Sequence, residues 1–210
     1  MKPEAPVESA PSLSGSVTGI VAPRGRLVTG RNLGAGDVII GVNSSGLHAN
    51  GVSLVIQRAL ELPEQFLTKL PSGRTIGEAA LTPTRSYVAL VEALLEAEIN
   101  IHALLPGTGD GVGKIAFDKR EMTYRIRDWP AIPELFQYYH EELRIPIEDC
   151  LKTFNWGVGY YIFVSAEDTE RVLQIGQTAG YELRAVGVVE KGERQVVYEP
   201  AGVVLSPPGE

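Results

Sequence analysis

Short apolar runs and apolar stripes at helical spacing alternate along the chain. Residues 38–42, Val-Ile-Ile-Gly-Val, form a β-branched run that ends at Asn43, which is typical of a buried strand. Apolar residues at helical spacing begin at Val52, where Asn50 or Gly51 can cap a helix. The pattern therefore predicts a strand, a polar loop and a helix in direct succession.

The rest of the chain continues this mixture of periods. Further strands are expected over 17–22, 99–105, 122–126 and 160–164, a closing hairpin-like pair over 183–189 and 195–198, and helices from Pro83 onwards and over 112–117, 132–143, 147–152 and 166–179. Strands and helices intermixed in one span predict an α+β or layered α/β fold, a mixed sheet covered by helices. We expect one domain over residues 16–205, after a Pro-, Ser- and Glu-rich leader or linker over 1–15.

Composition and charge exclude several classes of protein. The 210 residues contain one cysteine, Cys150, so an internal disulfide is impossible and a reducing, cytoplasmic location is favoured. The sequence has no apolar run of about 18 residues that would predict a membrane span. A net charge of −7 argues against a non-specific nucleic-acid binder, because binding to phosphates requires clustered Lys and Arg.

The polar loop over 44–51 is the richest candidate site. It carries Ser44, Ser45, Gly46, His48, Asn50 and Gly51 between the predicted strand and helix. Glycines let the backbone approach a ligand, and free N–H groups at a helix start favour an anion. The same residue types also serve as ordinary turn and capping residues, so the pattern alone leaves both interpretations open. No carboxylate lies near His48 in the sequence, and we expect no metal site.

A second glycine-rich loop follows the predicted strand at 99–105. It contains Thr108, Gly109, Asp110 and Gly111. Successive backbone N–H groups there can cradle a phosphate, with Lys114 adding positive charge, or the segment is a turn in which Asp110 supports its own backbone. Loops at the same ends of adjacent strands are the usual ligand sites of α/β sheets, so we expect this loop and the 44–51 loop to converge.

Three segments, taken in order, resemble one family. They are Gly36-Asp-Val-Ile-Ile-Gly41 running into Ser44-Ser-Gly-Leu-His-Ala-Asn-Gly-Val-Ser-Leu54, then Leu81-Thr-Pro-Thr-Arg-Ser-Tyr-Val88, and Thr153-Phe-Asn-Trp-Gly-Val-Gly159. Together they resemble the C-terminal half of aminoimidazole ribonucleotide (AIR) synthetase, the phosphoribosylformylglycinamidine cyclo-ligase of purine biosynthesis, over about residues 17–197. The first segment is shared more loosely with selenophosphate synthetases and hydrogenase-maturation ATPases.

The resemblance implies one half of a two-domain ligase. In that family ATP and Mg²⁺ are bound mainly by an N-terminal domain, and a phosphorylated substrate lies in the cleft against the C-terminal domain. This chain would be the substrate-side domain of a homodimeric enzyme, inactive without the ATP-binding domain, which belongs to the same gene or a separate chain. The carry-over makes Ser44, Ser45 and the Gly46 backbone anion donors, His48 and Asn50 polar substrate contacts, residues 108–111 a phosphate-facing loop, and Asn155 with Gly157 support for the cleft wall. It assigns no catalytic residue.

One departure keeps two alternatives open. The family's His-x-Thr-Gly-Gly-Gly loop is here Pro106-Gly-Thr-Gly-Asp-Gly111, and the carboxylate of Asp110 would repel a doubly charged phosphate unless a cation intervened. One alternative is a non-catalytic phosphate-ligand binding or regulatory module. The other is a domain of a related ATP-dependent maturation enzyme, hydrogenase-maturation or selenophosphate synthetase-like, acting on another phosphorylated or carbamoylated substrate. If His48 contacts substrate, we expect its replacement by alanine to cost less than about 0.5 kcal/mol of stability, whereas a satisfied core histidine would cost about 1–3 kcal/mol.

Overall fold

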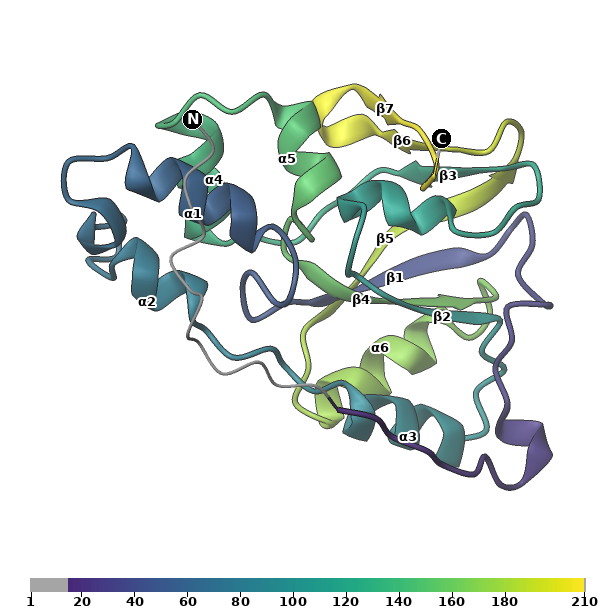
Figure 1. Cartoon of the computed structure of the whole chain (residues 1–210). Coiled ribbons are helices and arrows are strands. Elements are labelled where there is room, and N and C mark those ends of the chain that lie inside the picture. Colours follow the sequence, from purple (N-terminus) through teal and green to yellow (C-terminus); the bar gives the residue numbers. More distant parts are fainter. Residues whose placement is uncertain (1–14, 210) are drawn as a thin grey trace.

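A mixed sheet of seven strands organises residues 15–209, the part of the chain that the computed structural model describes (Figure 1). The strands are β1 (Val38–Asn43), β2 (Ala103–Pro106), β3 (Met122–Ile126), β4 (Val158–Val164), β5 (Leu183–Lys191), β6 (Gln195–Tyr198) and β7 (Val203–Leu205). Their order is β2-β4-β1-β5-β3-β6-β7. The β3–β6 pair is parallel and the other pairs are antiparallel. The predicted fold class, a mixed sheet with helices, is confirmed.

Helices cover both faces of this sheet. They are α1 (Val52–Leu60), α2 (Ile76–Ala80), α3 (Val88–Glu96), α4 (Glu134–Glu141), α5 (Ile147–Thr153) and α6 (Thr169–Thr178), with short 3₁₀ turns η1 (Arg24–Arg26), η2 (Gln65–Leu67), η3 (Gly111–Ala116) and η4 (Glu199–Ala201). In Figure 1, α3 and α6 lie below the sheet, η3 and α5 lie above it, and α1, α2 and α4 form a lobe at one end.

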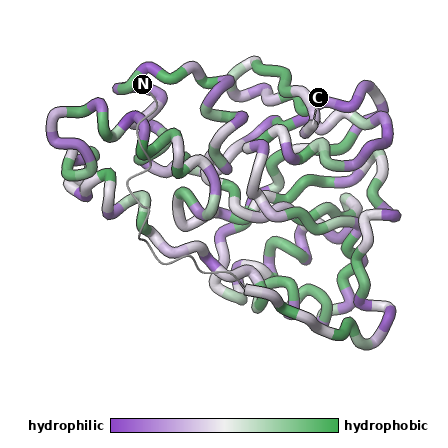
Figure 2. Tube along the Cα trace, in the orientation of Figure 1, coloured by the Kyte–Doolittle hydropathy of each residue, from purple (hydrophilic) through white to green (hydrophobic). Residues whose placement is uncertain are grey.

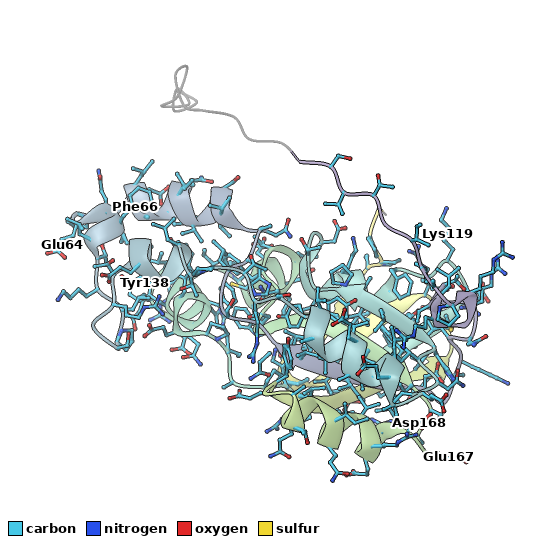
Figure 3. All side chains as sticks on the ribbon, turned by 90° about the horizontal axis from the view of Figure 1, so that it is seen from below. Glu64, Phe66, Lys119, Tyr138, Glu167 and Asp168 are labelled. Carbon is cyan, nitrogen blue, oxygen red and sulfur yellow. The ribbon has the colours of Figure 1, made fainter. Side chains whose placement is uncertain are left out.

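Side-chain alternation along the strands supplies a core on each side. Ile40 and Val42 pack with the α3–α6 side, while Ile39 points into the larger core on the opposite face. Figure 2 shows that hydrophobic stretches follow the central strands, whereas hydrophilic stretches gather in the outer loops. The helical lobe that carries Phe66 and Tyr138 lies at the opposite end of the molecule from Lys119 (Figure 3). Within the described residues, no helix combines the length and apolar character needed to cross a bilayer.

The sheet register places three loops at one end. Asn43, the last residue of β1, is opposite Val158, the first residue of β4. Pro106, the last residue of β2, is opposite Tyr160 of β4. The segments 44–51, 107–111 and 155–157 therefore leave the sheet side by side.

The helix expected from Pro83 onwards begins later, at Val88. The residues before it are held by Ser45, whose hydroxyl donates to the Pro83 carbonyl at 2.7 Å and accepts from the Arg85 N–H at 3.1 Å. These backbone groups bond to the 44–51 loop and not within a helix. The apolar spacing, which extends back to Tyr87, therefore predicts a helix that starts too early.

The expected pairing of the two last strands is wrong. β3 lies between β5 and β6, and Tyr124 of β3 faces Val189 on one side and Val196 on the other. The short link between β5 and β6 suggested a hairpin, but a strand from earlier in the chain separates them. β7, which pairs with β6, was not predicted.

The β-like run over 17–22 adopts no regular secondary structure in the described chain. Val17 is 98% exposed and Ile20 is 94% exposed, so these apolar side chains lack the packing that stabilises a strand. The other predicted elements are found with shifted bounds, and 112–117 forms the 3₁₀ turn η3 rather than an α-helix. Apart from Gly15, the leader over 1–15 lies outside the described residues.

Candidate functional site

Asn155 holds the 44–51 loop from inside. Its side-chain amide is 4% exposed and donates to the carbonyls of Gly46 at 2.8 Å and Leu47 at 3.3 Å. Its Oδ1 accepts from the Gly157 N–H at 2.9 Å and the Ser44 hydroxyl at 3.1 Å. Asn155, Ser44 and Gly157 therefore position the loop, because their polar groups are used within the protein.

Ser45 and His48 close the same loop. His48 adopts a left-handed backbone conformation with φ 58°, and its Nε2 lies 3.1 Å from both the Ser45 N–H and the Ser45 hydroxyl. An Nε2 that accepts from a backbone N–H carries no proton, so the neutral ring has its proton on Nδ1. Burial lowers the pKa of His48 and favours this neutral form. The Ser45 hydroxyl donates its proton to the Pro83 carbonyl, so His48 does not activate it as a nucleophile.

Gly159 and Tyr87 form part of the site that the sequence did not single out. A Cβ on Gly159 would overlap the Tyr87 hydroxyl and the His48 ring. Burial raises the pKa of Tyr87 to about 12, and its protonated hydroxyl donates to the Asn43 carbonyl at 3.0 Å. The Tyr87 ring stacks on Tyr160 at 5.1 Å. Tyr87 lies within the 81–88 segment, but its spacing matched a helix stripe and gave no sign of this contact.

The two glycine-containing loops meet. The Asn50 side-chain amide donates to the Thr108 hydroxyl, which joins the loop after β1 to the loop after β2. Gly109, Asp110 and Gly111 follow with φ values of 68°, 55° and 54°, three successive left-handed residues. The structure thus brings together the two loops that strand-end position predicts to converge.

The charges beside this junction are Lys114 and Asp110. The Lys114 ammonium group lies 3.9 Å from the position a Cβ of Gly109 would occupy, which places a positive charge against the 108–111 loop. Asp110 is exposed and adds a carboxylate at the same loop. Residues 15–209 contain no group of three or more His, Cys, Asp or Glu side chains arranged to hold a metal ion. Chemically, the Lys114 ammonium beside the 108–111 loop gives the junction a positive group that can attract an anion.

The burial of the His48 ring, which lowers its pKa, should make stability depend on pH. Because the pKa of His48 is lowered in the folded state, the unfolded chain takes up the proton more readily, and this contribution to stability is lost as the pH falls below the unfolded pKa of about 6.5. We expect the stability advantage of the wild type over His48→Gln to shrink between about pH 7.5 and pH 5.5. Urea unfolding of both proteins across that range measures this difference in stability. Parallel pH profiles of the two proteins would show that protonation of His48 does not affect stability.

The family match and the relatives found by sequence comparison agree with each other. The C-terminal domain of AIR synthase related protein matches residues 34–199. A phosphoribosylformylglycinamidine cyclo-ligase of Methanococcus maripaludis is 31% identical over 179 residues, covering 85% of this chain and 51% of that protein. The enzyme of the same name from Brevibacillus brevis is 34% identical over 194 residues, covering 89% and 55%. The chain spans about half the length of the curated relatives it matches.

Solved structures show the same fold at lower identity. A crystal structure of hydrogenase maturation protein HypE matches with a TM-score of 0.59 and 20% identity, covering 91% of this chain and 58% of that one. A structure of HypE in complex with ATP matches with a TM-score of 0.57 and 20% identity, covering 87% and 54%. Proteins that share this fold thus include one that binds ATP.

Proposed function

The chain belongs to the AIR synthase related protein family, whose C-terminal domain it matches over residues 34–199. From this premise we propose that it is the substrate-side half of an ATP-dependent enzyme similar to phosphoribosylformylglycinamidine cyclo-ligase. The observation that carries the proposal is the junction of the two strand-end loops through Asn50 and Thr108, with Lys114 beside it. Such a junction suits a phosphorylated small molecule, because backbone N–H groups and an ammonium both favour an anion.

In this proposal the residues of the chain bind and orient substrate. The N–H groups of residues 109–111 and the ammonium of Lys114 hold the phosphate. His48 presents its Nδ1–H as a donor toward the remainder of the substrate, since its Nε2 is used by Ser45. Asn155 and Ser44 keep the 44–51 loop in place. Ring closure within one molecule gains most from such fixed orientation, because it depends on the proximity of the reacting atoms.

The nucleotide is assigned to a companion ATP-binding half, from the same gene or a separate chain. ATP bound there would supply the phosphoryl group that turns an amide oxygen into a leaving group. Since residues 15–209 offer no cluster that could hold a metal ion, this chain takes no part in holding Mg²⁺ in the proposal. The complete enzyme is proposed to be a homodimer, and the chain alone is expected to form no ADP.

Asp110 favours a second candidate function. Its exposed carboxylate beside the 108–111 loop disfavours a dianion and suits a ligand of lower negative charge. The second candidate is therefore a domain of an ATP-dependent maturation enzyme that takes a carbamoylated substrate. In that case ribose 5-phosphate would not bind at the loop junction.

A titration of the full chain with ribose 5-phosphate tests the proposal. We expect saturable binding in the millimolar range or tighter, and a loss of about tenfold in affinity in Lys114→Gln, because a charge-assisted contact to the phosphate is removed. Lys119→Gln is the matched control, since it removes the same charge from an exposed lysine outside the site, and it should leave the affinity unchanged. Equal affinity for ribose and ribose 5-phosphate, or equal effects of the two variants, would contradict the proposal.

A further inference from the structure

A cavity of about 300 Å³ lies beside Trp156, the residue that follows Asn155 in the chain. The aromatic rings of Trp156 and Tyr198 line it, together with the apolar side chains of Ile132, Ile147 and Pro200. It is open to solvent on one side and is bordered by the end of α4, the start of α5 and the turn η4 that follows β6. Its volume is at the lower end of the range of small-molecule sites.

Polar groups reach this cavity from one face of α4. Gln137, His140 and Glu141 are spaced three and four residues apart, which places them side by side on the helix. His140 donates from Nδ1 to the Ile145 carbonyl at 2.8 Å, so Nε2 of the neutral ring remains an acceptor. The Glu141 carboxylate can only accept. His140 and Glu141 therefore offer acceptors to a ligand at this rim, while the Gln137 amide can both donate and accept.

Charge gives the same preference. Among the described residues that line the cavity, Glu141 is the one Asp, Glu, Lys or Arg, and its charge is negative. Aromatic faces also attract cations, and Trp does so most strongly. An anion would meet the Glu141 carboxylate without a compensating lysine or arginine in the lining.

The aromatic wall is held firmly. The carbonyl of Trp156 accepts from the Trp129 indole N–H at 2.8 Å, and the ring of His140 meets Trp156 edge-on at 6.2 Å. Trp129 in turn packs edge-on against Tyr198 at 5.2 Å. The apolar surface of the cavity is thus preformed, which reduces the entropy lost when a ligand binds.

We propose that this cavity is a binding site for a small organic cation, an amine attached to an apolar aromatic or branched body. The ammonium donates to the Glu141 carboxylate and to Nε2 of His140. The apolar body packs against Trp156, Ile147 and Pro200. This site is separate from the loop junction at Asn50 and Thr108, and its occupancy does not depend on the proposed function.

The probe for the test is 2-phenylethylamine, with the neutral 2-phenylethanol for comparison. The full chain, labelled with ¹⁵N, is titrated while the indole N–H signal of Trp156 and the amides of residues 137–141 are followed by NMR. The Trp129→Phe variant assigns the two indole signals, since the chain contains two tryptophans. We expect saturable shifts with a dissociation constant below about 1 mM for the amine and at least about fivefold weaker binding of the alcohol.

Two matched variants decide whether the cation is recognised by the cavity. Glu141→Gln should weaken amine binding at least about fivefold, because it removes the carboxylate and keeps the shape. Glu142→Gln removes the same charge from the next residue, which is exposed and outside the lining, and should change the dissociation constant less than about twofold. Absence of saturable shifts up to about 10 mM, equal binding of the alcohol, or equal effects of the two variants would overturn the proposal.

Discussion

Replacing Asn155 with alanine should lower the free energy of unfolding by about 3 kcal/mol, because it removes partners from four buried or half-buried groups at once. The carbonyls of Gly46 and Leu47 lose a donor, and the Gly157 N–H and the Ser44 hydroxyl lose an acceptor. For a chain of this size the melting temperature should fall by about 6–12 °C. The 44–51 loop would lose its internal support, so ligand binding at the junction should weaken as well.

Ser44→Ala is the matched control for that experiment. It removes one of the contacts to Asn155 Oδ1 and leaves the two bonds from the Asn155 amide intact, so it should cost about 1 kcal/mol. Urea unfolding of the wild type and both variants measures the difference. If the two variants were equally destabilised, Asn155 would not be the residue that organises the loop.

Replacing Gly111 with alanine should cost about 3–4 kcal/mol, the second large effect that the structure predicts. Gly111 has φ 54°, and a Cβ there would overlap the Leu151 carbonyl and the backbone of Lys152 at the end of α5. Backbone atoms cannot move aside as a flexible side chain can, so either η3 or α5 would have to shift. The variant should therefore lose both stability and phosphate binding.

Gly109→Ala separates the steric effect from the conformational one. Gly109 also has a left-handed backbone, with φ 68°, but the nearest atom to its Cβ position is the mobile Lys114 ammonium at 3.9 Å. This variant should cost about 1–2 kcal/mol, the strain of a left-handed alanine alone. Thermal unfolding of the two variants compares them, and equal losses would mean that the approach of α5 to Gly111 is not as close as the structure has it.

The strands and helices of the layered fold are predictable where the spacing of apolar residues within one short segment determines the type of element. The strand β1 follows from a short apolar run, and the helix α1 follows from apolar residues at helical spacing. Both elements need only an apolar surface to pack against, so their formation does not depend on one particular distant residue. The helix α2 was missed although Thr75 and Glu78 form a capping box, with the Thr75 hydroxyl accepting from the Glu78 N–H at 3.1 Å. Pro63, Pro71 and Gly73 lie close to this segment and favour turns, which obscures the short helix in the sequence pattern.

The bounds and neighbours of the remaining elements depend on contacts between residues far apart in the chain, which sequence patterns do not reveal. The late start of α3 depends on the hydroxyl of Ser45, some 40 residues earlier in the chain, and the separation of β5 from β6 depends on β3. The candidate site shows the same limit. Residue types in 44–51 and 108–111 indicated an anion site, yet only the structure distinguishes Asn155 and Ser44, whose polar groups point inward, from Lys114 beside the open loop.

The most direct measurement is to locate ribose 5-phosphate on the full chain by NMR. With ¹⁵N-labelled protein, the central claim predicts saturable amide shifts in residues 44–51 and 108–111, absent with ribose and strongly reduced in Lys114→Gln. Shifts in both loops are expected together, because the Asn50 to Thr108 hydrogen bond joins them. Binding elsewhere on the molecule, or no response of either loop up to about 10 mM ligand, would contradict the assignment of this chain as the substrate-side half of a cyclo-ligase-like enzyme.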